Sequence, residues 1–219
     1  MFRSITFLPL SNFVIPVEWL DGKKDVLTDT FLQFRYLLRD ADRAITHTAM
    51  ISVLREMLSA VGIPVRMEKA YSTPDSDGSY GRVDFLERIL SFVGKTTAYD
   101  FTSVSVDTAP RAAEASKDVG SVAEEIEARK CRENGALCAK EGWDFSPLGM
   151  EEPGNFGEGL KNLIQKCERR AVDYPESIPM GENWASPDFK TFWSQALRVR
   201  MVKCTRARWA AVLAHKLRV

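Results

Sequence analysis

Residues 96–106 limit the possible folds of this chain more than any other segment. The run from Thr96 to Val106 is rich in β-branched and aromatic side chains, which favour an extended strand. Asp100 lies inside this run, where a buried carboxylate is costly unless a partner neutralises it. The segment therefore predicts a strand whose carboxylate either belongs to a polar site or is paired with an arginine.

The segments around this strand predict the order α–β–β–β–α–β–α, followed by a helical tail. A helix capped by Thr46 is expected to end at Gly62, and Pro64 then forces an extended segment. The other expected elements are strands at 65–71, 82–92 and 143–150, helices at 121–141 and 156–170, a loop or frayed helix at 109–120, and one or two helices at 187–217. Ser121 and Glu124 have the spacing of a capping box. We therefore expect an α/β fold with a mixed sheet flanked by helices and a helical C-terminal tail.

The length of 219 residues suits one substantial core with an appendage. Apolar residues make up 45% and charged residues 27%, which excludes a disordered or collagen-like chain. We divide the sequence into a variable N-terminal lead at 1–40, a core at 41–170, and a linker with basic C-terminal helices at 171–219. No run approaches the roughly 18 apolar residues needed to span a membrane, so no membrane partner is expected.

The cysteine and histidine pattern argues against a structural zinc site. The four cysteines contain no CxxC pair, and the sequence has only two histidines. No convincing export signal is seen, so reduced thiols and a nuclear or cytoplasmic location are expected.

Charge is balanced over the whole chain but not along it. Of 30 basic and 30 acidic residues, eight basic and no acidic ones lie at 190–219. This distribution excludes a uniformly basic surface but allows a local basic face. The tail residues Arg198, Arg200, Lys203, Arg206 and Arg208 could follow the phosphates of a nucleic acid. Alternatively, they form the solvated face of a helix that packs on the body, because helical angles scatter them around its axis.

Two carboxylates on neighbouring predicted strands form the candidate site. Asp84 opens the second strand, and Asp100 lies in the third. If the connecting turn centres near Phe92, the two lie opposite one another; if it centres on Gly94 and Lys95, they are several residues out of register. Opposed carboxylates, about 5 Å apart at Cβ, suit Mg²⁺ or Mn²⁺. The alternative is that Asp84 is an ordinary strand-end residue and Asp100 pairs with an arginine.

Lys130 is the third candidate, because it falls on the apolar stripe of the helix at 121–141. Val122, Ile126 and Leu137 share this stripe, which should face the sheet. There Lys130 would neutralise the aspartates or hold a water or a scissile phosphate. Alternatively, its ammonium group reaches solvent.

Several short stretches, in this order and spacing, resemble one family. They are Ile45–His47, Ala60–Glu68, Gly81–Asp84, Tyr99–Val106, Glu127–Lys130, Ala136–Cys138, Gly142–Leu148 and Glu151–Gly157, with a similar tail at 193–209. The pattern is similar to the restriction-like endonuclease domain, of PD-(D/E)XK type, associated with the reverse transcriptases of site-specific non-LTR retrotransposons. It covers roughly residues 40–215. The resemblance implies a restriction-endonuclease-like αβββαβ core at 41–170 and metal-dependent cleavage of DNA.

The resemblance also implies roles for single residues. Asp84 matches the first acid, Asp100 the second, and Lys130 the lysine on the following helix. Mg²⁺ or Mn²⁺ at these acids would lower the pKa of a bound water and stabilise charge on the leaving oxygen. Glu68 is expected as an accessory ligand and His47 as a phosphate contact at a helix start. Their alternatives are an exposed strand residue and a capping or packing histidine.

The sequence departs from the family pattern at three positions. Val83 stands where a proline usually precedes the first acid, and Glu133 and Asn134 stand where relatives often have Lys-Tyr. Two alternatives to an active nuclease follow: a catalytically inactive nucleic-acid-binding relic, truncated or domesticated, and a structural or interaction module. DNA is the expected partner, with RNA or the reverse transcriptase region of a parent element as further partners.

Overall fold

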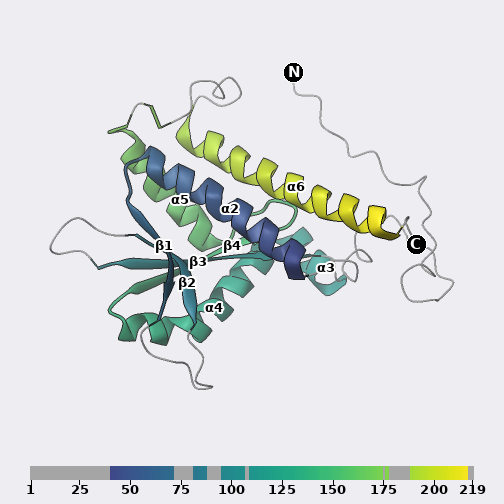
Figure 1. Ribbon diagram of the computed structural model, residues 1–219, viewed down its shortest axis with the longest axis horizontal. Helices are drawn as coiled ribbons and strands as arrows, with labels where there is room; N and C mark the ends of the chain where they lie inside the picture. Colours follow the sequence, from purple (N-terminus) through teal and green to yellow (C-terminus); the bar gives the residue numbers. More distant parts are fainter. Residues whose placement is uncertain are drawn as a thin grey trace.

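The computed structural model describes residues 40–71, 81–87, 95–106, 109–174, 176–177 and 188–216, so the predicted lead at 1–40, apart from its last residue, lies outside the described part. The elements are α2 (Asp40–Ala60), β1 (Val65–Ala70), β2 (Arg82–Glu87), β3 (Thr97–Val104), α3 (Ala109–Lys117), α4 (Ser121–Lys140), β4 (Asp144–Glu151), α5 (Glu158–Ala171) and α6 (Phe189–Lys216), as Figure 1 shows. This order confirms the predicted α/β class. A regular helix, α3, occupies part of the segment expected to be a loop or a frayed helix, and the tail forms one helix.

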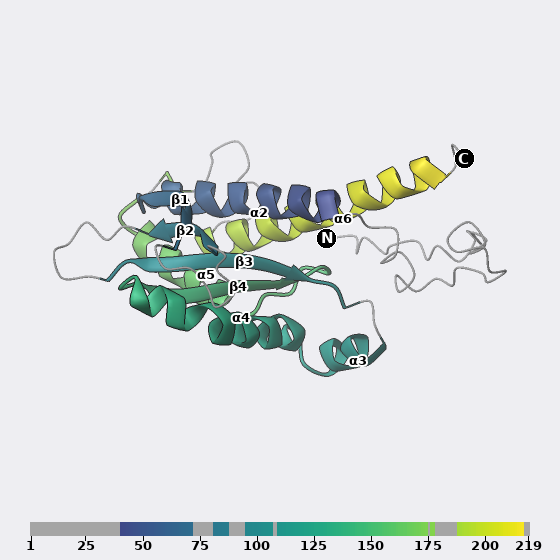
Figure 2. The same cartoon turned by 60° about the horizontal axis from the view of Figure 1, so that its bottom comes forward.

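The four strands form one mixed sheet in the order β1-β2-β3-β4. β2 pairs antiparallel with both β1 and β3, while β3 and β4 are parallel and are connected through α3 and α4. Figure 2 shows α2 and α6 on one side of the sheet, and α3 and α4 on the other. The predicted mixed sheet flanked by helices is thus present.

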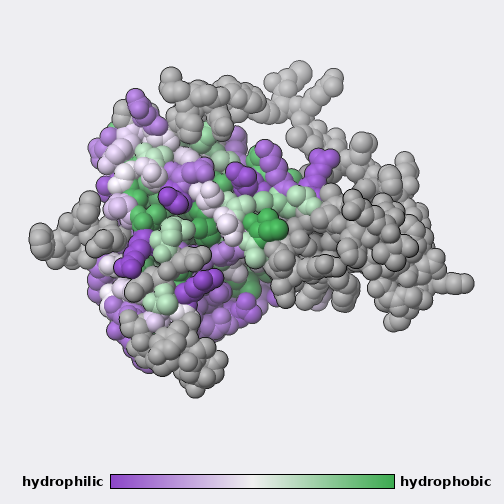
Figure 3. Space-filling model, in the orientation of Figure 1, coloured by the Kyte–Doolittle hydropathy of each residue, from purple (hydrophilic) through white to green (hydrophobic). Residues whose placement is uncertain are grey.

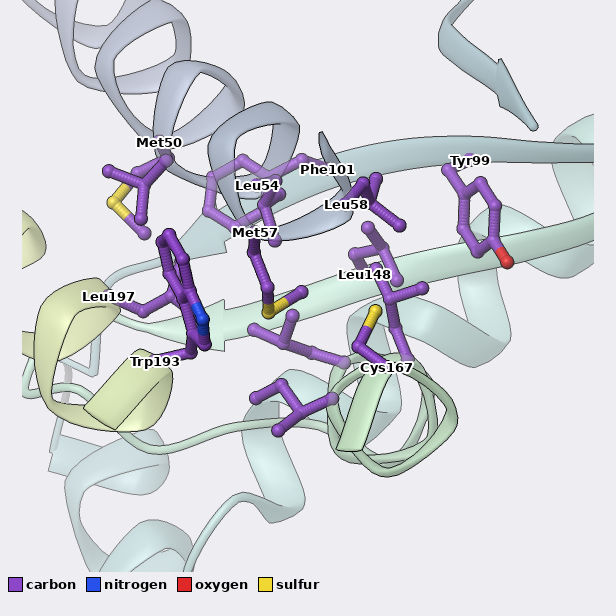
Figure 4. Packing of buried hydrophobic residues seen from close by; sticks show 14 of the residues in the cluster. Met50, Leu54, Met57, Leu58, Tyr99, Phe101, Leu148, Cys167, Trp193 and Leu197 are labelled. Carbon is purple, nitrogen blue, oxygen red and sulfur yellow. The ribbon is translucent and has the colours of Figure 1, made fainter. Parts of the chain in front are cut away.

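The main hydrophobic core lies between the sheet and the helices α2, α5 and α6. Figure 4 shows Met50 and Met57 of α2 close to Trp193 and Leu197 of α6. Burying a side chain of this size contributes about 1.5–3 kcal/mol. The C-terminal helix is therefore part of the core. None of the described helices is both long enough and apolar enough to cross a membrane.

The opposite face of the sheet is covered by α4. Leu137 and Cys138 pack with Leu86 and Ala98 there. Because side chains alternate along a strand, Asp100 faces the same helix as Ala98. The sheet therefore presents this carboxylate to α4.

Two predicted helix caps are wrong, although α4 does begin at Ser121 as predicted. α2 begins six residues before Thr46, which is buried inside the helix instead of capping it. The N-cap of α4 is Gly120, at φ 97°, and the Ser121 hydroxyl has no hydrogen-bond partner among the described residues. Glu151 of β4 accepts the N–H of Val122 at 3.2 Å, so another element supplies the carboxylate that a capping box would have supplied.

The start of α6 has a local cap, Asp188. Its Oδ1 accepts the N–H of Thr191 at 2.7 Å, and this bond lowers the pKa of the Asp188 carboxyl below its usual range. Loss of an N-cap costs about 1 kcal/mol. We therefore expect Asp188→Ala to lower the free energy of unfolding by about that amount at neutral pH, measured by urea denaturation.

The contribution of Asp188 should also depend on pH. Since its folded pKa is lowered, the stabilisation is present above the unfolded pKa of about 3.9 and is lost as the pH falls through the folded pKa. Asp188→Asn keeps an acceptor oxygen and serves as the control, with smaller losses at both pH values. Equal losses for Asp188→Ala at about pH 7 and about pH 2.5 would contradict the charged cap.

Candidate functional site

The candidate site lies where the pairing of β2 with β3 ends. Phe85 is opposite Tyr99, and continuing this register by one residue places Asp84 opposite Asp100. The N–H of Phe101, the next residue on β3, donates to Oδ2 of Asp84 at 2.6 Å. The Asp84 carboxylate thus takes a backbone donor at the point where the ladder stops, and it is fixed beside β3.

Of the two registers considered from the sequence, the observed pairing is the one that brings Asp84 and Asp100 level with each other. The turn between the strands, at Phe92 or at Gly94 and Lys95, lies outside the described residues. Residues opposed in an antiparallel pair share a face of the sheet, with Cβ atoms about 5 Å apart. Continued by one residue, the observed register agrees with the prediction that Asp84 and Asp100 lie opposite one another, and the Asp84 carboxyl is close enough to raise the pKa of Asp100.

The same row of the sheet continues into β1. Met67 is opposite Phe85 and Lys69 is opposite Val83, so the backbone of Glu68 lies opposite Asp84. The side chain of Glu68 is outside the described part of the structure. Its role as an accessory metal ligand stays a prediction.

Lys130 approaches the carboxylates from α4. Its Nζ lies 2.8 Å from Oδ2 of Asp100, and its side chain is only 25% exposed. The partner of Asp100 is thus a lysine and not an arginine, and the ammonium group does not turn away to solvent. Val122 and Ile126 on the same stripe are buried, as predicted.

His47 approaches Asp84 from α2, on the other side. Its Nε2 lies 3.0 Å from Oδ2 of Asp84, and its ring lies 6.0 Å from that of Phe101, centroid to centroid. The hydrogen bond with Asp84 raises the pKa of His47 above its usual value. The predicted place at a helix start is wrong, because α2 begins at Asp40 and His47 lies in its second turn. The two alternatives for His47, a capping residue and a packing residue, do not account for its hydrogen bond with Asp84.

Asp84, Asp100, Lys130 and His47 form a polar site of two acids and two bases. Burial raises the pKa of Asp100, the ion pair with Lys130 opposes this, and the nearby Asp84 carboxylate raises the pKa further. Lys130 offsets the charge of one carboxylate, and His47, in its protonated form, would offset the other. Across the described ranges, no three His, Cys, Asp or Glu side chains are gathered closely enough to hold a metal ion, but Glu68 is not among the side chains described.

The basic residues predicted to bind nucleic acid do not join this pocket. They lie on α6, which packs against α2 and α5, whereas Lys130 lies on α4 on the opposite face of the sheet. Arg198 donates to the carbonyl of Gly154 at 3.1 Å, and Arg200, Lys203 and Arg206 are exposed. The side chain of Arg208 is outside the described part.

A buried glutamate on α4 was missed from the sequence. Glu127 accepts the N–H of Gly149 at 2.6 Å and the N–H of Gly159 at 3.0 Å, at the start of α5. Burial raises its pKa. The glycines at 149, 157 and 159 are the sequence feature that could have indicated this buried contact. A Cβ at Gly157, for example, would lie 2.5 Å from Oε1 of Glu127. Glu127 therefore joins helix and strand structurally and stands apart from the Asp84–Asp100 pair.

A second polar cluster lies at the other end of β2. Glu87 accepts the hydroxyl of Tyr99 at 2.9 Å and lies 2.5 Å from Nζ of Lys166 on α5. Burial raises the pKa of Tyr99 well above its usual value and that of Cys167 to about 12. The Tyr99 hydroxyl and the Cys167 thiol therefore stay protonated, while the ion pair of Lys166 with Glu87 fastens α5 to the sheet.

No protein-family model matches the sequence, and no curated protein matches it either. The functional argument therefore depends on the arrangement of Asp84, Asp100 and Lys130.

Proposed function

We propose that this chain is a metal-dependent endonuclease that hydrolyses DNA phosphodiester bonds. The observation that supports this proposal is that Asp84, Asp100 and Lys130 come together from β2, β3 and α4. The strand order, with two antiparallel pairs and one parallel pair, is compatible with a restriction-endonuclease-like αβββαβ core. The similarity to domains associated with retrotransposon reverse transcriptases belongs to the same proposal.

The residues of the pocket fit Mg²⁺ or Mn²⁺. Both cations prefer oxygen ligands, and Asp84 and Asp100 supply carboxylates from one row of the sheet. Mutual repulsion and burial raise the pKa of Asp100, which is the electrostatic situation that a cation relieves. When bound, the metal would lower the pKa of a water and stabilise charge on the leaving oxygen. Glu68 is the further ligand in this proposal.

The protein groups around the acids have separate roles. Phe101 and His47 each bond Oδ2 of Asp84, so its carboxylate is held in one orientation. Lys130 places a positive charge at the same pocket, where it would bind the scissile phosphate. His47 is a positioning residue here, because it acts through Asp84.

A second candidate function is binding of nucleic acid without cleavage. The ion pair of Lys130 with Asp100 and the contact of His47 with Asp84 already neutralise both acids within the protein. A relic of the same fold would keep these contacts for stability. The two candidate functions differ only in whether a metal ion and a phosphate displace these contacts of Lys130 and His47 with the two acids.

The test is nicking of supercoiled plasmid by the full chain with Mg²⁺, Mn²⁺ or EDTA. We expect metal-dependent nicking that falls about 100-fold or more in Lys130→Met, because one charge at the reacting phosphate is lost. Lys140→Met changes an exposed lysine on the same helix and should be as active as wild type.

Two results would count against cleavage. Wild-type protein that retards the plasmid on a gel without nicking it, in either metal, would favour the second candidate. Equal nicking by wild type and Lys130→Met would remove Lys130 from the chemistry. Circular dichroism of each variant excludes loss of the fold as the cause.

A further inference from the structure

The outward side of α6 is strongly basic. The helix runs from Phe189 to Lys216 and contains no Asp or Glu. Hydrophilic side chains line the edge of the molecule where it lies (Figure 3), and its C-terminal part continues beyond the start of α2 (Figure 2). At about 1.5 Å per residue, this helix is roughly 42 Å long. Its exposed side, on the α2 side of the sheet, therefore carries positive charge, together with Val199 and Val202, which are 50% and 36% exposed.

The packing divides the basic residues of α6 into two kinds. Arg198 is engaged by the body: it donates to the carbonyl of Gly154 at 3.1 Å, and its guanidinium lies 4.9 Å from the ring centre of Phe156. Such bonds fix the side chain in place and make it structural. The sequence predicts that the basic residues of this helix are scattered around its axis. Part of that scatter disappears when Arg198, which is bonded to the body, is set aside.

The other three described residues form a stripe. Arg200, Lys203 and Arg206 follow one another at three-residue steps, and all three are exposed. The buried side of the same helix is formed by Leu197 and Met201, which belong to the main core. No carboxylate in the described part of the chain is ion-paired with any residue of this basic stripe. The basic stripe is thus exposed, and no described carboxylate neutralises it.

We infer that the basic stripe, Arg200, Lys203 and Arg206, binds the phosphate backbone of duplex DNA. Successive members are about 4.5 Å apart along the helix axis, and each strand of a duplex carries one phosphate per 3.4 Å or so of its axis. Because arginine and lysine side chains are long and flexible, they can bridge the difference between the spacing of the residues and the spacing of the phosphates. The inference goes beyond cleavage, because binding through α6 does not require the metal pocket.

Duplex DNA is favoured over single strands because the described aromatic residues of α6 are committed to the core. Single-strand binding uses exposed rings on which bases stack. Phe192 and Trp193 are buried, at 7% and 4% exposure, and the Trp193 indole N–H donates to the carbonyl of Ser177. Among the described side chains of α6, the exposed cations have no exposed ring beside them, and such a surface is suited to backbone contacts.

The experiment measures binding of a fluorescein-labelled duplex of about 30 base pairs to the full chain, by anisotropy, at several KCl concentrations. EDTA is present, so the result does not depend on cleavage. The variant is the triple change Arg200→Gln, Lys203→Gln and Arg206→Gln. The control removes the same charge elsewhere, at three exposed arginines: Arg55→Gln, Arg66→Gln and Arg169→Gln.

We expect the stripe variant to bind at least about 10-fold more weakly at low salt and the control variant to stay within about 2-fold of wild type. Each lost phosphate contact should reduce the slope of log K against log[salt] by about 0.9, so three should reduce it by about 2.7. Equal weakening in both variants would overturn the inference, because net charge alone would explain it. Absence of duplex binding by wild type, or tighter stripe-dependent binding of an RNA hairpin, would also overturn it.

Discussion

Replacing Asp100 with asparagine is expected to abolish metal-dependent cleavage, by at least about 1,000-fold. In the proposed nuclease, Asp100 both ligates the metal and holds Lys130, whose Nζ is 2.8 Å away. Asparagine keeps the shape of the side chain but offers a neutral amide, which is a poor ligand for Mg²⁺ or Mn²⁺. One substitution therefore removes a ligand and the partner of the lysine together.

The fold should survive this change. Lys130 would lose its partner, but it is 25% exposed and its flexible stem allows the ammonium to reach water. We expect the free energy of unfolding to fall by about 1–2 kcal/mol. Plasmid nicking measures the activity, and titration calorimetry with Mn²⁺ measures metal binding without reference to cleavage.

The control is Asp144→Asn, which changes an exposed acid of β4 that pairs with Lys95 at 3.6 Å. Both partners are more than half exposed, so this surface pair contributes little to stability. Asp144→Asn should nick plasmid and bind Mn²⁺ as wild type does. If Asp100→Asn behaves in the same way, the carboxylate pair is not a catalytic centre.

Much of the pocket could be predicted because it depends on short-range regularities. Strand alternation and the antiparallel pairing of two strands adjacent in sequence fix the relation of Asp84 to Asp100. Helical periodicity places Lys130 on the stripe that faces the sheet. Each of these rules acts within an element or between strands adjacent in sequence, so the sequence alone contains the information.

The features that could not be predicted are all contacts between elements distant in the chain. His47 bonds Asp84 only because α2 crosses the sheet next to Phe101. Glu151 caps α4 from β4, which is why the capping box expected at Ser121 does not form. No propensity or spacing rule describes such partners, since they exist only after the layers have packed.

Replacing Glu127 with alanine is expected to destabilise the protein more than any other single change considered above. Its carboxylate is buried and accepts N–H groups from Gly149 and Gly159. Alanine would leave the donor of the buried Gly149 without a partner and open space at the junction of α4, β4 and α5. Each orphaned buried donor costs about 1–3 kcal/mol, and a bond to a charged group costs more. We expect a loss of about 3–5 kcal/mol in the free energy of unfolding, measured by urea denaturation followed by tryptophan fluorescence.

The matched control is Glu125→Ala, an exposed glutamate two residues earlier on the same helix, for which we expect a change within about 0.5 kcal/mol. Glu127→Gln should fall between the two, because its oxygen can still accept from Gly149 while its NH₂ group meets the N–H of Gly159, donor against donor. Gly157→Ala should also be destabilising, because its Cβ would lie 2.5 Å from Oε1 of Glu127. Equal stability of Glu127→Ala and Glu125→Ala would mean that α5 and β4 are held by apolar packing alone. A large loss in Glu127→Ala with normal plasmid nicking in Glu127→Gln would separate this structural carboxylate from the proposed catalytic pair, Asp84 and Asp100.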